Sequence, residues 1–175
     1  GVNQPPARLL WLRTHRSDDW ARCAAVIQPK DYIATRLTGE IATDVNSALG
    51  LYNPRSRQYS PELLRLLDVE PGKMPPVLEQ TAIAGYVRPE AAMVTGLRPG
   101  IPVIAGTIDA WCDIIGCVGI APGGAVDVAG TSEVVALTTA ELVSGDGVFG
   151  APLADGRYWV GGPMQVGGAA LTWLS

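Results

Sequence analysis

Two aspartates stand in an otherwise apolar stretch of the chain, "PVIAGTIDAWCDIIGCVG" at residues 102–119. Asp109 falls where a predicted strand gives way to a predicted helix, and Asp113 follows one helical turn later on the same face. A carboxylate in the place of Asp109 can act as a general base, but it can equally cap the helix that follows. Asp113 can likewise serve a ligand, or it can be solvated or hydrogen-bonded within its own helix. Both pairs of alternatives stay open.

A glycine-bearing turn is the second candidate for chemistry. Gly130, Thr131 and Ser132 join predicted strands at 125–129 and 134–138. Such a turn exposes backbone N–H groups and two hydroxyls with little side-chain bulk, which suits an oxyanion such as phosphate. A structural interpretation is also available, because a hairpin needs a glycine wherever φ is positive.

A pair of glycines, Gly167 and Gly168, opens a predicted helix at 167–174, directly after a predicted strand at 156–162. Close packing of the helix on the strand would explain the pair without any ligand. However, ligands of α/β sheets usually bind at strand ends. The order of carboxylate, anion turn and glycine-headed helix therefore favours a site that handles phosphate.

The elements that must position these residues change in kind near residue 100. Before it the chain is mostly helical, with a strong helix start where Pro61 follows the N-cap candidate Ser60, and a left-handed stop at Gly39. After it the chain is rich in strands, and the apolar run at 101–107 is typical of a strand buried on both faces. The pattern predicts an α/β fold. The helices predicted before residue 100 cover 8–13, 17–26, 30–40, 60–69 and 89–96.

Composition excludes several classes of partner. Thirteen basic and seventeen acidic residues give a net charge of −4 without a basic cluster, which argues against nucleic-acid binding. Three cysteines and one histidine lack the spacing of a zinc site, so no metal ligands are predicted and the thiols are expected to be reduced. No apolar run reaches the roughly 18 residues of a membrane span. We therefore expect a cytoplasmic protein without a membrane partner.

Several segments, taken together, resemble the FGGY sugar kinases, in particular the xylulokinase-like and ribulokinase-like branch. The most specific are "LTGE…TD…SA" at residues 37–48, the strand–Asp–helix at 102–116, and the Gly-Thr-Ser turn. The resemblance implies an actin-like (ribonuclease-H-like) α/β fold with parts of two domains. Residues 1–117 would be the C-terminal part of the sugar-binding domain, and residues 118–175 the beginning of the nucleotide-binding domain.

The resemblance also implies roles for the candidate residues. Asp109 would be the catalytic base that accepts the proton of a sugar hydroxyl, and ATP with Mg²⁺ would supply the phosphoryl group. Many relatives follow this aspartate with Asn or Gln, which contacts sugar, whereas this chain has Ala110. The identity of the sugar is therefore open. The sugar-binding residues would be Asp109, Ala110 and Asp113, and the nucleotide-binding residues Gly130, Thr131, Ser132 and Gly168.

Parts of the family pattern have no counterpart in the chain, namely an N-terminal Asp-Gly-Thr phosphate loop and a C-terminal glycine-rich adenine site. We therefore expect the central fragment of a kinase that is inactive by itself. A non-catalytic remnant that binds a sugar or a partner protein is the alternative from another class. Within the kinases, a polyol kinase of the glycerol type is an alternative to a ketose kinase. The expected partner is a small-molecule sugar, and association into a homodimer is left open.

Overall fold

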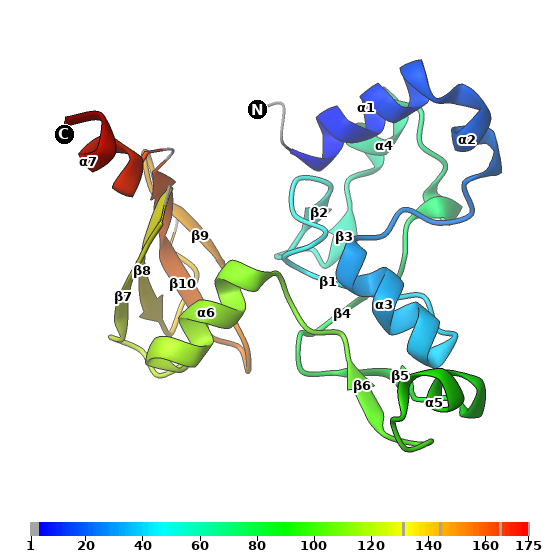
Figure 1. The fold of residues 1–175 in the computed structure, drawn as a ribbon. Helices are drawn as coiled ribbons and strands as arrows, with labels where there is room; N and C mark the ends of the chain where they lie inside the picture. The colour runs from blue at the N-terminus through cyan, green and yellow to red at the C-terminus, as the bar shows by residue number, and fades with distance from the viewer. Residues whose placement is uncertain (1–3, 131, 144, 165, 175) are drawn as a thin grey trace. The chain divides into compact units, whose positions relative to one another are not determined.

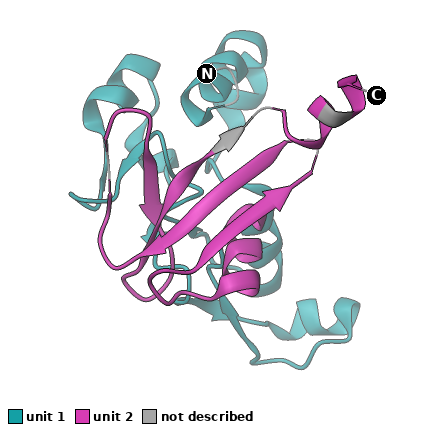
Figure 2. Ribbon diagram, turned by 90° about the vertical axis from the view of Figure 1, so that its left-hand side faces the viewer, with its two compact units in different colours: residues 1–107 teal, residues 108–175 magenta. Residues whose placement is uncertain are grey.

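A computed structural model describes residues 4–130, 132–143, 145–164 and 166–174. The chain forms two compact units, with residues 1–107 in unit 1 and residues 108–175 in unit 2 (Figure 2).

Unit 1 combines helices with short strands (Figure 1). Strand β4 pairs with β1 in parallel, whereas β2 pairs with β3 and β5 with β6 in antiparallel fashion. The helices are α1 (Pro5–His15), α2 (Ser17–Arg22), α3 (Pro29–Thr38), α4 (Pro61–Leu67) and α5 (Pro89–Thr95), with a 3-10 turn η1 (Pro71–Lys73). The strands are β1 (Thr43–Asp44), β2 (Tyr52–Asn53), β3 (Gln58–Tyr59), β4 (Val77–Leu78), β5 (Ile83–Tyr86) and β6 (Pro102–Ile104).

Helix ends follow the capping rules where the sequence predicts them. The Ser60 side chain accepts a hydrogen bond from the Leu63 N–H, and Pro61 is the first residue of α4. Gly39 ends α3 in the left-handed conformation, with φ of 86°. Helix α2, in contrast, ends at Arg22, so the prediction of a helix over 17–26 is wrong for its last four residues. Cys23, which caps α2, is extended.

The apolar core of unit 1 lies in two clusters. One joins α1 to α4 and consists of Leu9, Leu51, Leu64, Leu67 and Val69. The other lies between α5 and its neighbours, with Leu37 and Val103 packed against Val87, Ala91 and Ala92.

The strand predicted at 101–107 is shorter and less buried than expected. Strand β6 covers Pro102–Ile104, and Pro102 and Ile104 are exposed while Val103 is half-buried. The prediction of a strand buried on both faces is therefore wrong for the described structure. The alternation of exposed and half-buried residues could not be recognised in the sequence, because the exposed residues Pro102 and Ile104 are apolar as well.

A buried ionic network links α3 to β1. The Lys30 ammonium lies 2.5 Å from Asp31 Oδ1 and 3.0 Å from Asp44 Oδ1. Both carboxylates are almost inaccessible, Asp31 at 1% and Asp44 at 0% exposure. A buried carboxylate is costly unless charge and hydrogen bonds compensate it. Here one cation serves two carboxylates, and further hydrogen-bond donors complete the compensation.

Those donors come mainly from the backbone. Gln28 N–H donates to Asp31 Oδ2 at 3.0 Å, which closes a capping box at the start of α3. Asn46 N–H donates to Asp44 Oδ2 at 3.0 Å, and Ser47 N–H to Asp44 Oδ1 at 3.3 Å. The turn after β1 therefore forms around the Asp44 carboxylate.

Unit 2 is an antiparallel four-stranded sheet in the order β7-β8-β10-β9. Figure 1 shows α6 lying along this sheet. The hairpin predicted at 125–129 and 134–138 is confirmed, with β8 starting one residue earlier. The elements are α6 (Asp109–Val118), β7 (Ala125–Ala129), β8 (Glu133–Thr139), β9 (Phe149–Pro152), β10 (Tyr158–Met164) and α7 (Gly168–Leu174).

Aromatic contacts fasten α6 to the sheet. Trp111 on α6 meets Trp159 on β10 edge to face at 4.8 Å, and Phe149 on β9 meets the same indole at 5.6 Å. Ile114, one turn after Ala110, is fully buried. This apolar side of α6 leaves Asp109 and Asp113 exposed on another side of the helix. In the part of the chain that the structure describes, no helix has the length and hydropathy needed to cross a membrane.

Gly161 in β10 allows this strand to approach the backbone of β8 closely, and the neighbouring Gly162 provides a control. A Cβ at Gly161 would lie 1.9 Å from the Val135 carbonyl oxygen, whereas a Cβ at Gly162 would meet nothing within 4 Å. Because the obstacle is backbone, Gly161→Ala should lower the free energy of unfolding of unit 2 by about 1–3 kcal/mol. Gly162→Ala, the matched control, should change it by less than about 0.5 kcal/mol. Thermal unfolding followed by tryptophan fluorescence measures both, and equal effects would contradict the packing described here.

Candidate functional site

Asp109 is the first residue of α6 and is exposed. Ile108 occupies the N-cap position and makes no side-chain cap, so the structure does not use Asp109 as the N-cap. The carboxylate instead accepts a hydrogen bond from the Ala110 N–H, with 2.8 Å between Asp109 Oδ1 and the nitrogen. The first turn of a helix is a favourable place for negative charge. Asp109 thus presents an accessible carboxylate in a defined position on its helix.

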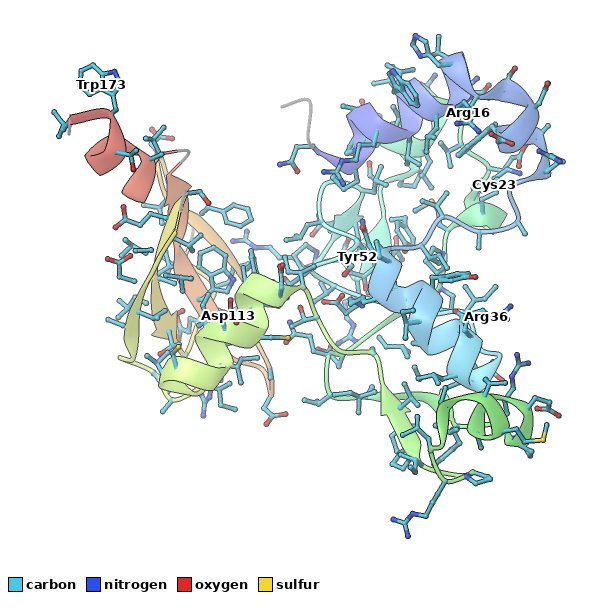
Figure 3. The ribbon with its side chains drawn as sticks, viewed as in Figure 1. Arg16, Cys23, Arg36, Tyr52, Asp113 and Trp173 are labelled. Atoms are coloured by element: carbon cyan, nitrogen blue, oxygen red, sulfur yellow. The ribbon has the colours of Figure 1, made fainter. Side chains whose placement is uncertain are left out.

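Asp113 and Ala110 accompany Asp109 on α6. Asp113, labelled in Figure 3, is exposed. It follows Asp109 by four residues, which puts the two carboxylates on the same side of the helix. Ala110 is half-buried and has only a methyl group, so it offers a hydroxylated ligand no side-chain hydrogen bond. The two aspartates are the charged side chains of this face.

The structure brings the predicted turn and the predicted glycine helix together. Gly168 N–H donates to the Gly130 carbonyl oxygen at 2.8 Å, which ties the start of α7 to the turn between β7 and β8. A Cβ at Gly168 would lie 2.7 Å from that oxygen. Gly168 therefore permits close packing, the structural explanation that the sequence left open for the glycine pair. This contact does not exclude a ligand beside it.

One backbone donor of the turn and one at the start of α7 form hydrogen bonds within the chain. Gly130 N–H donates to the Ser132 carbonyl oxygen at 2.7 Å, and Gly168 N–H is engaged as described above. These two amides donate within the chain instead of pointing to a ligand. Ser132 is exposed, whereas Thr131 lies outside the described residues.

A hollow of about 590 Å³ lies at this junction. It is wide open to solvent and shallow, unlike the enclosed clefts that surround most of a small ligand. Trp173 contributes to its wall and is 84% exposed, extending outward from α7 (Figure 3). The hollow is lined by Gly130, Gly168, Ala169, Thr172 and Trp173.

Three lining residues, Ala169, Thr172 and Trp173, are absent from the sequence-based prediction. Helical spacing was the signal that could have found two of them. Thr172 and Trp173 stand four residues after Gly168 and Ala169, so they share the faces of those residues.

Two carboxylates flank the turn on one face of the sheet. Glu133 pairs with Ala129 across the hairpin, which puts Asp127 diagonally beside Glu133. Partial loss of solvent around the carboxyl, together with the charge of Asp127 and a hydrogen bond to it, raises the pKa of Glu133. Within the described ranges no group of three or more His, Cys, Asp or Glu side chains could hold a metal ion, so no metal ligands are assigned.

The family of the chain follows from comparison with known proteins. A model of the N-terminal domain of the FGGY family of carbohydrate kinases matches residues 3–116. The chain belongs to the FGGY family. The match ends within α6, and the two compact units divide after residue 107, while the predicted domain boundary after residue 117 stays a prediction.

Individual relatives agree with this assignment. A probable L-xylulose kinase from Pasteurella multocida is 38% identical over 112 residues, which are 62% of this chain and 23% of that protein. An autoinducer-2 kinase from Photorhabdus laumondii is 36% identical over 115 residues, which are 65% of this chain and 21% of that protein. The chain spans less than a quarter of the length of these two curated relatives.

The crystal structure of a xylulose kinase from Rhodospirillum rubrum resembles this fold at a TM-score of 0.91 and 30% identity. The likeness covers 99% of this chain and 36% of that one. The predicted fold class, an α/β fold of the actin-like type, is therefore confirmed.

The Asp127–Glu133 pair makes stability depend on pH. A raised pKa means that the folded chain holds the Glu133 proton more tightly than the unfolded chain does. Stability is therefore lost as the pH rises from the ordinary value of 4.5 through the raised value. Asp127→Asn removes the neighbouring charge and should make this loss smaller.

Melting temperatures at pH 4 and pH 7 measure the effect. Asp155→Asn, which removes another exposed carboxylate of unit 2, is the matched control and should behave as the wild type. An unchanged pH dependence in Asp127→Asn would contradict the coupling of the two carboxylates.

Proposed function

We propose that the chain is the central part of an ATP-dependent carbohydrate kinase that phosphorylates a hydroxyl of a ketose such as xylulose or a related pentulose. Membership of the FGGY family supports a sugar kinase, and relatives named L-xylulose kinase and xylulose kinase support the ketose. The observation that carries the proposal is the exposed carboxylate of Asp109 in the first turn of α6. A general base must be accessible to its substrate, and this one is.

Asp109 acts as the base in this proposal. Its carboxylate accepts the proton of the sugar hydroxyl as the hydroxyl oxygen forms a bond to the γ-phosphorus of ATP. The bond from that phosphorus to the β,γ-bridging oxygen breaks, and ADP leaves with the electron pair. General-base assistance of this kind typically contributes about 10²–10⁴ in rate. The remaining acceleration in phosphoryl transfer comes mainly from positioning and charge stabilisation.

Sugar recognition falls to the exposed side of α6. Asp113 would accept a hydrogen bond from a second hydroxyl, one helical turn from the reacting one. Ala110, which is half-buried beside them, has only a methyl group and offers a sugar no side-chain hydrogen bond. Because Ala110 has no side-chain amide, the two carboxylates are the charged groups that this face would offer a sugar.

Nucleotide binding is assigned to the hollow between the β7–β8 turn and α7. Gly130 and Gly168 line this hollow, Ser132 of the same turn is exposed, and Thr131 completes the turn in the sequence. Mg²⁺ would arrive with ATP, since kinases commonly bind this ion through one or two carboxylates and the substrate phosphates. When bound, the ion neutralises charge that develops on those phosphates.

The proposal extends to domains and location. Residues 1–117 are assigned to the sugar-binding domain and residues 118–175 to the nucleotide-binding domain of a cytoplasmic enzyme. A homodimer stays a prediction.

The test is carried out on the complete kinase, which on this proposal extends beyond the present chain. Sugar-dependent ADP release, measured on a panel of pentuloses, hexuloses and polyols, identifies the substrate, and a pentulose is expected to give the highest kcat/KM. If no sugar of the panel stimulated the release of ADP, the proposal would be contradicted.

Asp109→Asn then tests the base. The variant should lower kcat by about 10²–10⁴ with little change in sugar affinity, because the amide keeps the shape but cannot take the proton. Asp113→Asn is the comparison, and it should raise the KM for the sugar more than it lowers kcat. Turnover by Asp109→Asn near the wild-type rate would remove Asp109 from the catalytic role.

A further inference from the structure

The segment that follows β6, residues 105–107, is held by side chains from two other elements of unit 1. Lys30 Nζ of α3 donates to the Ala105 carbonyl oxygen at 3.1 Å. The Thr107 hydroxyl donates to Asp44 Oδ2 at 2.9 Å, and it accepts from Asn46 Nδ2 at 3.2 Å. Each end of the segment is thus tied to the ionic network of Lys30 and Asp44.

Backbone hydrogen bonds fix the same segment. Ala105 N–H donates to the Ala82 carbonyl oxygen, and Gly106 N–H donates to the Gln80 carbonyl oxygen, both at 2.9 Å. Gly106 has φ of 67°, which a glycine adopts without strain. The segment therefore turns sharply after β6 and yet is restrained at consecutive residues.

The side chains around Thr107 are polar although they are buried, where apolar side chains could fill the same space. Asp44 and Asn46 are 0% and 4% exposed, and Thr107 is 9% exposed. Apolar residues of similar volume often stabilise a protein as well as a buried ion pair does. What polar contacts add is direction, because each hydrogen bond tolerates only a narrow range of distance and angle.

We propose that Thr107, held by Asp44 and Asn46, is a positioning residue for the catalytic base. This inference rests on the proposed function. Asp109 follows Thr107 by two residues in the chain. A restrained Thr107 therefore limits the conformations of the backbone that leads into Asp109, and reacting groups must be held within about 0.5 Å of their productive geometry. Asp44 and Asn46 orient the threonine hydroxyl, and Lys30 holds Asp44 and the Ala105 carbonyl oxygen.

The test compares hydroxyl-bearing and hydroxyl-free side chains at residue 107 in the complete kinase. Thr107→Val keeps the shape and removes the hydroxyl, and it should lower kcat about 10- to 100-fold while the KM values for sugar and ATP change less than about twofold. Thr107→Ser keeps the hydroxyl and should retain a kcat within about threefold of the wild type. A kcat unchanged in the valine variant, or lowered equally in both variants, would overturn the inference.

A second pair keeps the test decisive if Thr107→Val does not fold. Thr107→Ala and Thr107→Ser lack the same methyl group and differ only in the hydroxyl, so a lower kcat for alanine alone supports positioning. Equal kcat values would overturn it.

Asp109→Asn, assayed in parallel, separates the two claims. If it retains turnover, the proposed base is wrong. If it is inactive while Thr107→Val turns over as the wild type does, only the positioning role fails.

Discussion

One half-buried cation, Lys30, compensates the two buried carboxylates of unit 1. Lys30 neutralises Asp31 in its own helix and Asp44 in β1, and both carboxylates are shielded from water. Burial of these two carboxylates would be costly without the ammonium and the N–H donors around them. Helix α3, the turn after β1 and the segment after β6 therefore depend on the same set of contacts. Changing one of them disturbs the others.

Unit 2 positions its residues by a different means. Its glycines let backbone segments approach so closely that a single Cβ would collide, as at Gly161 and Gly168. The aromatic contact of Trp111 with Trp159 fastens α6, which carries Asp109 and Asp113. In the proposed kinase, directional ionic contacts in unit 1 and close backbone packing in unit 2 serve the same purpose. Both restrict the positions available to groups that take part in phosphoryl transfer.

Local signals in the sequence predicted the local structure well. The Ser60 cap, the left-handed Gly39 and the hairpin around Gly130 are each encoded within a few residues, and all three are confirmed. Segment motifs also led to the correct family. The ionic network could not be predicted because Lys30 and Ala105 are 75 positions apart, and Asp44 and Thr107 are 63 apart. The direction in which the Gly130 amide donates depends on the conformation of the turn, which composition does not specify.

A double-mutant cycle on Lys30 and Asp44 tests the central ionic contact most directly. Native-state hydrogen exchange of amides in α3 and β1 reports the free energy of opening of unit 1 separately from unit 2. Lys30→Met alone leaves the buried carboxylates of Asp31 and Asp44 without their cation. Asp44→Asn alone leaves Lys30 paired with Asp31 only. We expect Lys30→Met to cost about 3–5 kcal/mol. The double variant should cost less than the sum of the single variants by about 0.5–3 kcal/mol, and strictly additive losses would contradict the account.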